Sequence, residues 1–174
     1  MKQEDKLKQV NEEIARRFTS IKNKLNGASD IAGMLEILFD EVENEFQIPF
    51  VWLTLVDENK NATVIEAVKS SDKLKTRLNL ISRAVFEKLL KEGVKPVLIN
   101  NNLKPYYKLF PQSKKYFAKS MAIVPLCLND EIIGSWNNGD VSPERYAPDM
   151  DKDILEKFAN LISNRLTEIA NIAV

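Results

Sequence analysis

Residues 120–150, SMAIVPLCLNDEIIGSWNNGDVSPERYAPDM, decide the fold of this chain. Two apolar runs, 121–128 and 131–136, flank Asn129-Asp130, a residue pair that favours a tight turn. The stretch therefore predicts two antiparallel strands joined by a short loop. The structure after the second strand is harder to predict, because the end of that strand is polar and two prolines follow.

The Asn138-Gly139 pair is the first feature to interpret after that strand. Asn-Gly is a strong hairpin signal, because a type I′ turn needs positive φ at both positions. A hairpin also needs a returning strand, and residues 141–148 show no alternation and hold two prolines. An active-site loop is the second interpretation, but no nucleophile, metal-ligand cluster or phosphate-binding glycine run accompanies its charged residues. We therefore favour a third interpretation.

The third interpretation is a corner between a strand and the last helix. We predict that the strand ends at the Asn-Gly bend and that Pro148 lies in the first turn of the helix, where its missing N–H costs nothing. Asp149, Asp151 and Asp153 would then lie at the favourable end of the helix dipole. The residues predicted to hold the corner are Gly139, Asp140 through backbone N–H groups, Arg145 through carbonyls or a carboxylate, and Tyr146 by packing under the helix.

Two helices are predicted at the N-terminus. Apolar residues spaced three and four apart predict a helix over residues 2–25 with one apolar stripe on a charged surface. Asn26-Gly27 ends it, and a second helix follows with Ser29 as its N-cap. Because a stripe of that length needs a partner, we predict a homodimer in which this helix packs with the helix 150–172 and their symmetry mates.

The middle of the chain combines β-branched runs with one helical stripe. The pattern predicts, in order, a strand over 49–56, a partner strand over 62–68, a helix over 74–89, a strand over 96–100 and short helical pieces over 101–119. With both ends of the chain, this is an α+β fold around an antiparallel sheet of five or six strands. We expect the terminal helices on one face of the sheet and the inserted helices on the other.

The composition is that of one globular domain, with 174 residues, 44% apolar and 29% charged, and a net charge of zero. We divide the chain into a dimerisation helix, residues 1–26, and a domain, residues 27–174. No apolar run approaches the roughly 20 residues that span a bilayer, and the polar N-terminus is not a secretory signal. We therefore expect a cytoplasmic protein without membrane contact.

The chain has no histidine and a single cysteine, Cys127. This excludes Ser-His-Asp and Cys-His triads, His-ligated zinc or haem, and a disulfide within the chain. Cys127 lies in the apolar run 121–128, so we expect a buried, unreactive thiol. No metal, cofactor or catalytic residue is predicted.

Charge is unevenly distributed along the chain. Residues 28–68 hold nine acids against Lys60 alone, whereas residues 93–129 hold six lysines and no acid. We expect the two segments to be neighbours whose charges offset each other. Whether the lysine-rich segment binds an anion stays open.

Residues 120–166 resemble the C-terminal half of a GAF domain, in which a strand ending in Val-Pro-Leu precedes a second strand containing Ile-Gly and a closing helix. Here those residues are Val124-Pro125-Leu126 and Ile133-Gly134. The corner, GS-x-x-x-GD-x-SPERYAPDM, is similar to that of an uncharacterised bacterial GAF-related family, which has a Gly-Ser-x-Asp-Pro-x-Arg-Phe-x-Pro-x-Met motif and a long helix before the domain. The resemblance implies a GAF-like fold over residues 28–174.

The chain departs from the better-defined GAF domains in its motifs. Trp136, Asn137 and Asn138 stand where relatives have small or aliphatic residues. The stretch NKNAT lacks the aromatic residue and the acid of the cyclic-nucleotide motif, and one cysteine provides neither a bilin attachment site nor the cysteine set of free methionine-sulfoxide reduction. The resemblance therefore implies a sensory or regulatory domain rather than an enzyme.

A small-molecule sensor acting as a homodimer is the favoured function, with any signal passed to a separate output protein. Its mostly apolar pocket is expected between the sheet and residues 76–119. The alternative is a dimerisation or protein-interaction module without a ligand, and zero net charge disfavours nucleic-acid binding by residues 104–119. Core or lid packing is the competing role for the aromatic candidates. The candidate ligand-binding residues are Trp52, Thr54, Tyr106, Tyr107, Ser120, Ser135 and Asn137.

Overall fold

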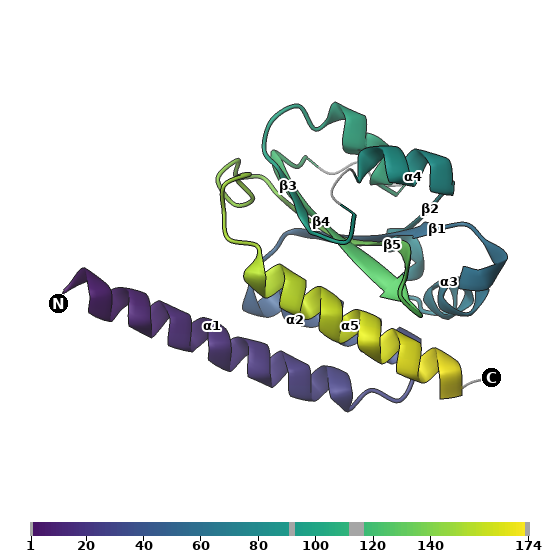
Figure 1. The fold of residues 1–174 in the computed structure, drawn as a ribbon, viewed down its shortest axis with the longest axis horizontal. Coiled ribbons are helices and arrows are strands. Elements are labelled where there is room, and N and C mark those ends of the chain that lie inside the picture. The colour runs from purple at the N-terminus through teal and green to yellow at the C-terminus, as the bar shows by residue number, and fades with distance from the viewer. Residues whose placement is uncertain (1, 91–92, 112–116, 173–174) are drawn as a thin grey trace.

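A five-stranded sheet forms the centre of the computed structural model, which describes residues 2–90, 93–111 and 117–172 (Figure 1). Neighbouring strands are antiparallel except β1 and β2, which are parallel, so the sheet is mixed rather than purely antiparallel. In spatial order the strands are β2 (Leu78–Ile81), β1 (Phe50–Val56), β5 (Glu131–Asp140), β4 (Ser120–Leu128) and β3 (Val97–Ile99).

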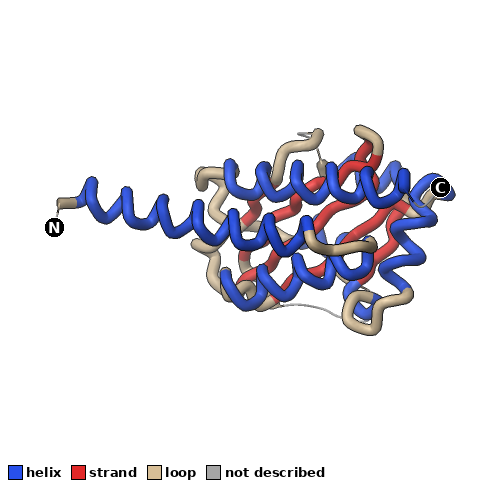
Figure 2. The backbone as a smooth tube through the Cα atoms, turned by 90° about the horizontal axis from the view of Figure 1, so that it is seen from below, coloured by secondary structure: helices blue, strands red, loops and turns tan. Residues whose placement is uncertain are grey.

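Helices cover both faces of this sheet. Three long helices lie on one face: α1 (Gln3–Asn26), α2 (Ile31–Glu45) and α5 (Asp153–Ile172). α1 packs alongside α2 and α5, with its axis nearly parallel to theirs, and its N-terminal half extends beyond the sheet (Figures 1 and 2). The other face carries α4 (Arg83–Leu89) and the 3₁₀ helix η3 (Lys104–Leu109). The α+β class and the placement of the terminal helices are confirmed.

The region between β1 and β2 differs from the prediction. Residues 62–68, predicted as a strand, form the helix α3 (Ala62–Lys69), which follows the short 3₁₀ turn η1 (Asn59–Asn61). Its buried residues Val64, Ile65 and Val68 follow helical spacing and pack on the same face as α2. The β-branched content was misleading, because strand propensity depends on the packing surface that the fold provides.

The predicted helix over 74–89 is also wrong. It divides into a 3₁₀ turn η2 (Lys75–Arg77), strand β2 and helix α4, whose N-cap Ser82 accepts a hydrogen bond from the N–H of Val85. The four residues of β2 pair in parallel with β1, Leu78 opposite Leu53. Apolar spacing typical of a helix was therefore overridden by pairing with a strand about 25 residues earlier in the chain.

Two helix starts lie later than predicted. The N-cap of α2 is Asp30, whose Oδ1 accepts from the N–H of Gly33 at 2.6 Å, and not Ser29. α5 begins at Asp153, so Pro148 lies ahead of the helix. The residues between have a turn of their own, in which the N–H of Met150 bonds the carbonyl of Ala147 at 3.0 Å.

The β4–β5 hairpin forms as predicted. Asn129 and Asp130 have φ of 50° and 67°, the left-handed pair that a tight type I′ hairpin turn requires. Further along β5, Gly134 allows the backbones of β1 and β5 to approach closely. A Cβ at this position would lie 2.1 Å from the carbonyl oxygen of Thr54. Only glycine fits there without moving β1.

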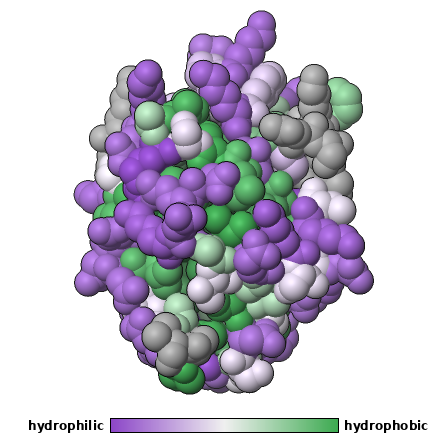
Figure 3. Space-filling model, turned by 90° about the vertical axis from the view of Figure 1, so that its right-hand side faces the viewer, coloured by the Kyte–Doolittle hydropathy of each residue, from purple (hydrophilic) through white to green (hydrophobic). Residues whose placement is uncertain are grey.

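Ion pairs at the surface connect segments other than those predicted. Hydrophilic side chains cover much of the end of the molecule away from the N-terminus, with apolar residues visible between them (Figure 3). Glu41, Asp40 and Glu43 of α2 pair with Lys24, Lys73 and Arg77, not with the lysines of 93–129. The prediction that the lysines of 93–129 neutralise the acids of 28–68 is thus wrong for these three acids.

In the described part of the chain, the helices are too short or too polar to cross a membrane.

Candidate functional site

A buried network of hydrogen bonds joins the sheet to η3. Asn137 of β5 donates its Nδ2–H to Oγ1 of Thr54 on β1 at 3.0 Å, and Thr54 donates to the carbonyl of Leu109 at 2.6 Å. Ser135 donates to Oδ1 of Asn137 at 2.7 Å. These side chains are completely buried, and the pleat places all three on the η3 side of the sheet.

Two further side chains bind the same end of η3. Trp52 donates its indole N–H to the carbonyl of Leu109 at 2.9 Å, and Asn79 of β2 donates to the carbonyl of Lys108 at 2.7 Å. Carbonyls at the end of a helix have no partner within the helix, so these contacts satisfy groups that burial would otherwise leave unpaired. We call Trp52, Thr54, Asn79, Ser135 and Asn137 the lid network.

The structure brings four of the seven predicted ligand-binding residues together in the lid network and places the other three elsewhere. Tyr106 is half-buried and packs on the apolar cluster beneath η3. Tyr107 is 52% exposed, with its ring 5.4 Å from that of Phe110. Ser120 is buried at the far end of β4 and donates to the carbonyl of Ser142 at 2.7 Å. In this structure the polar groups of the lid network bind protein groups.

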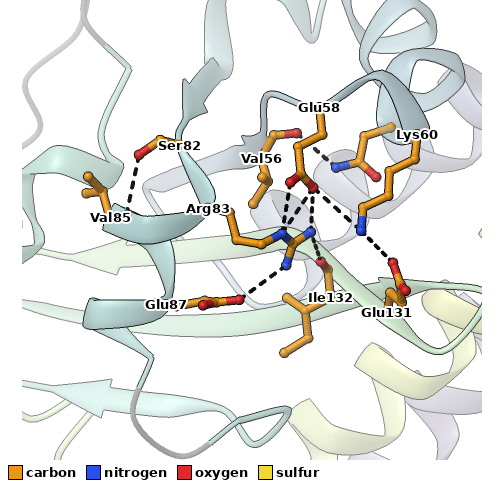
Figure 4. Close-up of polar contacts among 10 residues, drawn as sticks. Val56, Glu58, Lys60, Ser82, Arg83, Val85, Glu87, Glu131 and Ile132 are labelled. Atoms are coloured by element: carbon orange, nitrogen blue, oxygen red, sulfur yellow. Dashed lines mark hydrogen bonds and ion pairs between the residues drawn. The ribbon is translucent and has the colours of Figure 1, made fainter.

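An ion-pair network fastens α4 to the sheet on the same side (Figure 4). Arg83 binds the carboxylate of Glu58 through two nitrogens, at 2.7 and 3.0 Å, and donates to the carbonyl of Ile132 at 3.0 Å. Lys60 bridges Glu58, at 3.8 Å, and Glu131, at 2.6 Å. The hydrogen bonds from Arg83 lower the pKa of Glu58, and a smaller effect of burial opposes them.

A cavity of about 290 Å³ lies on the opposite face, between the helices and the end of the sheet. Trp136 and Phe158 are two of its aromatic walls, with ring centroids 6.3 Å apart and edge-to-face geometry. α1 contributes Ile14 and Arg17 to the lining. We call this space the helix-side cavity. Its other apolar lining includes Val42, Phe46, Ile48, Leu98, Ile154 and Leu155.

One end of the helix-side cavity is polar. Asn138 is buried there, and its Oδ1 accepts the indole N–H of Trp136 at 2.7 Å. Arg145 donates to the carbonyl of Phe46 at 2.6 Å. Burial raises the pKa of Tyr146 to about 12, and hydrogen bonds from Asn138 and Arg145 act in the opposite direction. Asp151 also lines the cavity.

The corner after β5 is built differently from the prediction. Asn138 and Gly139 do not form a bend, because both pair with β1 and β4 and the strand continues to Asp140. Asp140 accepts the N–H of Ser142 at 2.9 Å, as expected for a side chain that satisfies the following backbone. Tyr146 is buried beside α5, and Arg145 binds a carbonyl of the loop after α2.

Cys127 is half-buried rather than fully buried. It lies next to a bulge in the β4–β5 ladder, and its N–H binds Oγ of Ser163 on α5 at 2.9 Å. Burial raises the pKa of its thiol, and the nearby charge of Asp130 adds to this. A raised pKa keeps the thiol protonated, which opposes nucleophilic reactivity.

Sequence reasoning missed Asn79 and Asn138 as site residues. Asparagine is depleted in strands, and neither Asn79, between two leucines, nor Asn138, before Gly139, has sequence neighbours that signal a buried strand position. The period of two along β5 also separates Ser135 and Asn137 from Trp136 and Asn138 onto opposite faces. That alternation could have divided the candidates into two sites.

Comparison with known proteins identifies the fold. Residues 28–167 match the GAF domain family. The GAF domain of an Acinetobacter phosphoenolpyruvate-protein phosphotransferase is similar in structure, with a TM-score of 0.59 and 12% identity over 92% of this chain and 96% of that one. Free methionine-R-sulfoxide reductase of Neisseria meningitidis, in complex with its substrate, has a TM-score of 0.59 and 14% identity, covering 92% of each chain. Likeness at this identity shows the fold alone, and no curated protein sequence matches the chain.

Proposed function

The chain belongs to the GAF domain family, and from this premise we propose that it binds a small molecule and acts as a homodimer through α1. GAF domains are in general sensory or regulatory. The dimer is supported by one observation: the N-terminal half of α1 extends beyond the rest of the domain (Figure 2), and apolar residues of its stripe are exposed there.

The stripe of α1 is half covered. Its C-terminal members Ile21 and Leu25 are buried in the core with α2 and α5. Its N-terminal members Val10 and Ile14 are 54% and 36% exposed. A projecting helix derives little stability from propensity alone and needs packing along its apolar face. This supports a partner at the N-terminal half of α1.

A second copy of the chain is the partner we propose. Residues 2–13 carry three lysines and four acids, so two such helices are nearly neutral and do not repel each other. A two-fold interface places the same stripe on both sides, and an amphipathic helix is self-complementary in that arrangement. The expected contact joins α1 of each protomer, with α5 alongside.

Light scattering on the full chain at micromolar concentration tests the dimer. We expect a dimer for the wild type and a monomer for the double variant Val10→Glu/Ile14→Glu. Val141→Glu is the matched control, because Val141 is also 54% exposed but lies in the loop after β5. A wild-type monomer, or a double variant that stays dimeric with native circular dichroism, would overturn the proposal.

We propose that the domain has no catalytic activity. The reductase that shares the fold has only 14% identity with this chain. The one thiol, Cys127, has a raised pKa and lies at the β4–β5 bulge, away from the lid network. Among the described residues, no cluster of cysteine, aspartate and glutamate side chains is arranged to hold a metal ion. These observations support regulation rather than chemistry.

A dimerisation module without a ligand is the second candidate. It is favoured by the lid network, whose side chains bind η3 where the sequence predicted a ligand. Native mass spectrometry of the purified dimer separates the two candidates. A bound small molecule, or saturable uptake of one, supports the sensor, and a dimer that takes up none of the probes described below supports the module.

A further inference from the structure

We propose that the helix-side cavity binds a small amphipathic carboxylate, with its apolar part against Trp136 and Phe158 and its carboxylate at Tyr146 and Arg145. This inference rests on the proposed sensory function and specifies its ligand class. It places the site on the face of the sheet opposite the lid network.

The walls and size of the cavity define the apolar part of the ligand. At about 30 Å³ for each water-sized group, 290 Å³ holds roughly ten non-hydrogen atoms. Trp136, Phe158 and Leu98 are buried side chains with apolar surface facing this space. Ligand sites are mostly apolar with a few placed polar groups, and this cavity has that composition.

The polar end of the cavity offers donors. Oδ1 of Asn138 is already occupied by the indole N–H of Trp136. Hydrogen bonds from Asn138 and Arg145 favour the ionised form of Tyr146, as donors to its oxygen do. Tyr146 lines the cavity, and its hydroxyl has one proton that it can donate to a ligand. Its pKa of about 12 keeps that proton in place at neutral pH.

Arg145 is the group at this end that suits an anion. It uses one N–H on the carbonyl of Phe46 at 2.6 Å, and a guanidinium has five. Arg17 and Asp151 also line the cavity, but Glu13 pairs with Arg17 at 3.1 Å, so the carboxylate is assigned to Arg145 alone. A carboxylate is an acceptor-only group that binds a guanidinium and a hydroxyl together, so it matches this end better than an alcohol or an amine.

Binding of octanoate to the full chain tests the site, since octanoate has ten non-hydrogen atoms by its formula. Trp52→Phe leaves Trp136 as the only tryptophan, so fluorescence then reports the cavity wall. We expect saturable quenching by octanoate in the millimolar range or below, binding at least about tenfold weaker for octanol, and no binding of octylamine. Equal affinity for the three probes, or no binding of octanoate, would overturn the proposal.

Arg145→Gln and Arg83→Gln form a matched pair. Each arginine donates to a backbone carbonyl, Phe46 or Ile132, but on opposite faces of the sheet. Calorimetry should show at least about a tenfold loss of octanoate affinity for Arg145→Gln and no change for Arg83→Gln. Equal affinity of the two variants would refute the assigned carboxylate position.

Phe158→Leu keeps Arg145 and enlarges the cavity. It should lower the affinity for octanoate and for octanol by the same factor.

The outcomes separate this inference from the proposed function. A protein that is dimeric and does not bind octanoate refutes the site and leaves the α1 dimer standing. A monomeric protein that binds octanoate with the Arg145 dependence refutes the dimer and retains the site. If octanoate quenches the fluorescence only at concentrations at which it quenches the Arg145→Gln variant to the same extent, the binding is adventitious. That outcome rejects the site.

Discussion

Asn137 and Thr54 lie 83 residues apart in the sequence and form a buried hydrogen bond of 3.0 Å across β5 and β1. Thr54 in turn donates a hydrogen bond to the carbonyl of Leu109, and this bond holds the end of η3 against the sheet. The Thr54 hydroxyl both accepts and donates, so it connects β5 to η3, beside the direct bonds that Trp52 and Asn79 make to the same end of η3.

Thr54→Val should lower the free energy of unfolding by about 1–3 kcal/mol, because it leaves a buried amide without its acceptor and keeps the side-chain volume. Urea denaturation measures the loss. Thr19→Val is the control, since the Thr19 hydroxyl also bonds a carbonyl, that of Ala15 at 3.0 Å, but is exposed. Similar losses for the two variants would show that the lid network contributes no more than a surface contact.

Gly134→Ala should cost about 3 kcal/mol, because the added Cβ would lie 2.1 Å from the carbonyl oxygen of Thr54. Gly27→Ala is the control, since its Cβ would meet only ordinary contacts at 3.5 Å or more. Thermal unfolding of both variants gives the comparison. A melting temperature for Gly134→Ala equal to that of wild type would contradict the close approach of β1 and β5.

Glu58→Gln should change how stability depends on pH. The folded pKa of Glu58 lies below the unfolded value, so its stabilisation is complete above the unfolded pKa of about 4.3 and is lost as pH falls through the folded value. The melting temperature of wild type should therefore exceed that of Glu58→Gln at pH 7, and the two should converge in acid. Glu66→Gln, exposed on α3, should follow wild type throughout. A constant difference at all pH values would refute the assigned ion pair.

Cys127→Ser should leave dimerisation and octanoate binding unchanged, with a loss of stability of about 1 kcal/mol. Because burial raises the pKa of the thiol, labelling of the native protein should be slow at pH 7 and accelerate as pH rises. The urea-unfolded protein gives the reference rate. Native labelling as fast as this reference would restore the redox interpretation.

Asp140→Ala should lower the free energy of unfolding by about 1 kcal/mol, because the N–H of Ser142 loses its acceptor. The affinity for octanoate should not fall, since Asp140 does not line the helix-side cavity and its negative charge, which acts on Tyr146, opposes a bound anion. Glu144→Ala, exposed in the same loop, is the control. Loss of binding at an unchanged melting temperature would make Asp140 itself part of the ligand site.

The ends of the chain could be predicted from sequence because their signals are local. The stripe of α1 and the Asn129-Asp130 turn need no information from distant residues, and the family resemblance over 120–166 is confirmed by the match to the GAF family. Residues 62–68 and 78–81 were assigned the wrong element because their packing and pairing are non-local. Neither β-branched content nor helical spacing contains that information.

The site was harder to predict than the fold for a related reason. Four of the seven candidates do lie together in the structure, and two of them bind a backbone carbonyl of η3. Because every residue has a backbone carbonyl, the sequence does not show which carbonyl a side chain will bind. Arg145 was assigned to the corner alone. The structure shows its bond to Phe46, and our proposal adds a ligand contact on the other side of the same guanidinium.

The position of β5 between β1 and β4 has a consequence for synthesis on the ribosome. Of the five strands that the structure describes, β5 is the last in sequence and the one that connects β1–β2 to β3–β4. During translation, β1 (residues 50–56) therefore lacks its antiparallel neighbour until residues 131–140 have been synthesised. Contacts so distant in sequence form slowly, and a nascent chain with an unpaired strand is open to non-native pairing. We expect a ribosome-stalled chain ending before residue 131 to bind chaperones, and release of β5 to end that binding.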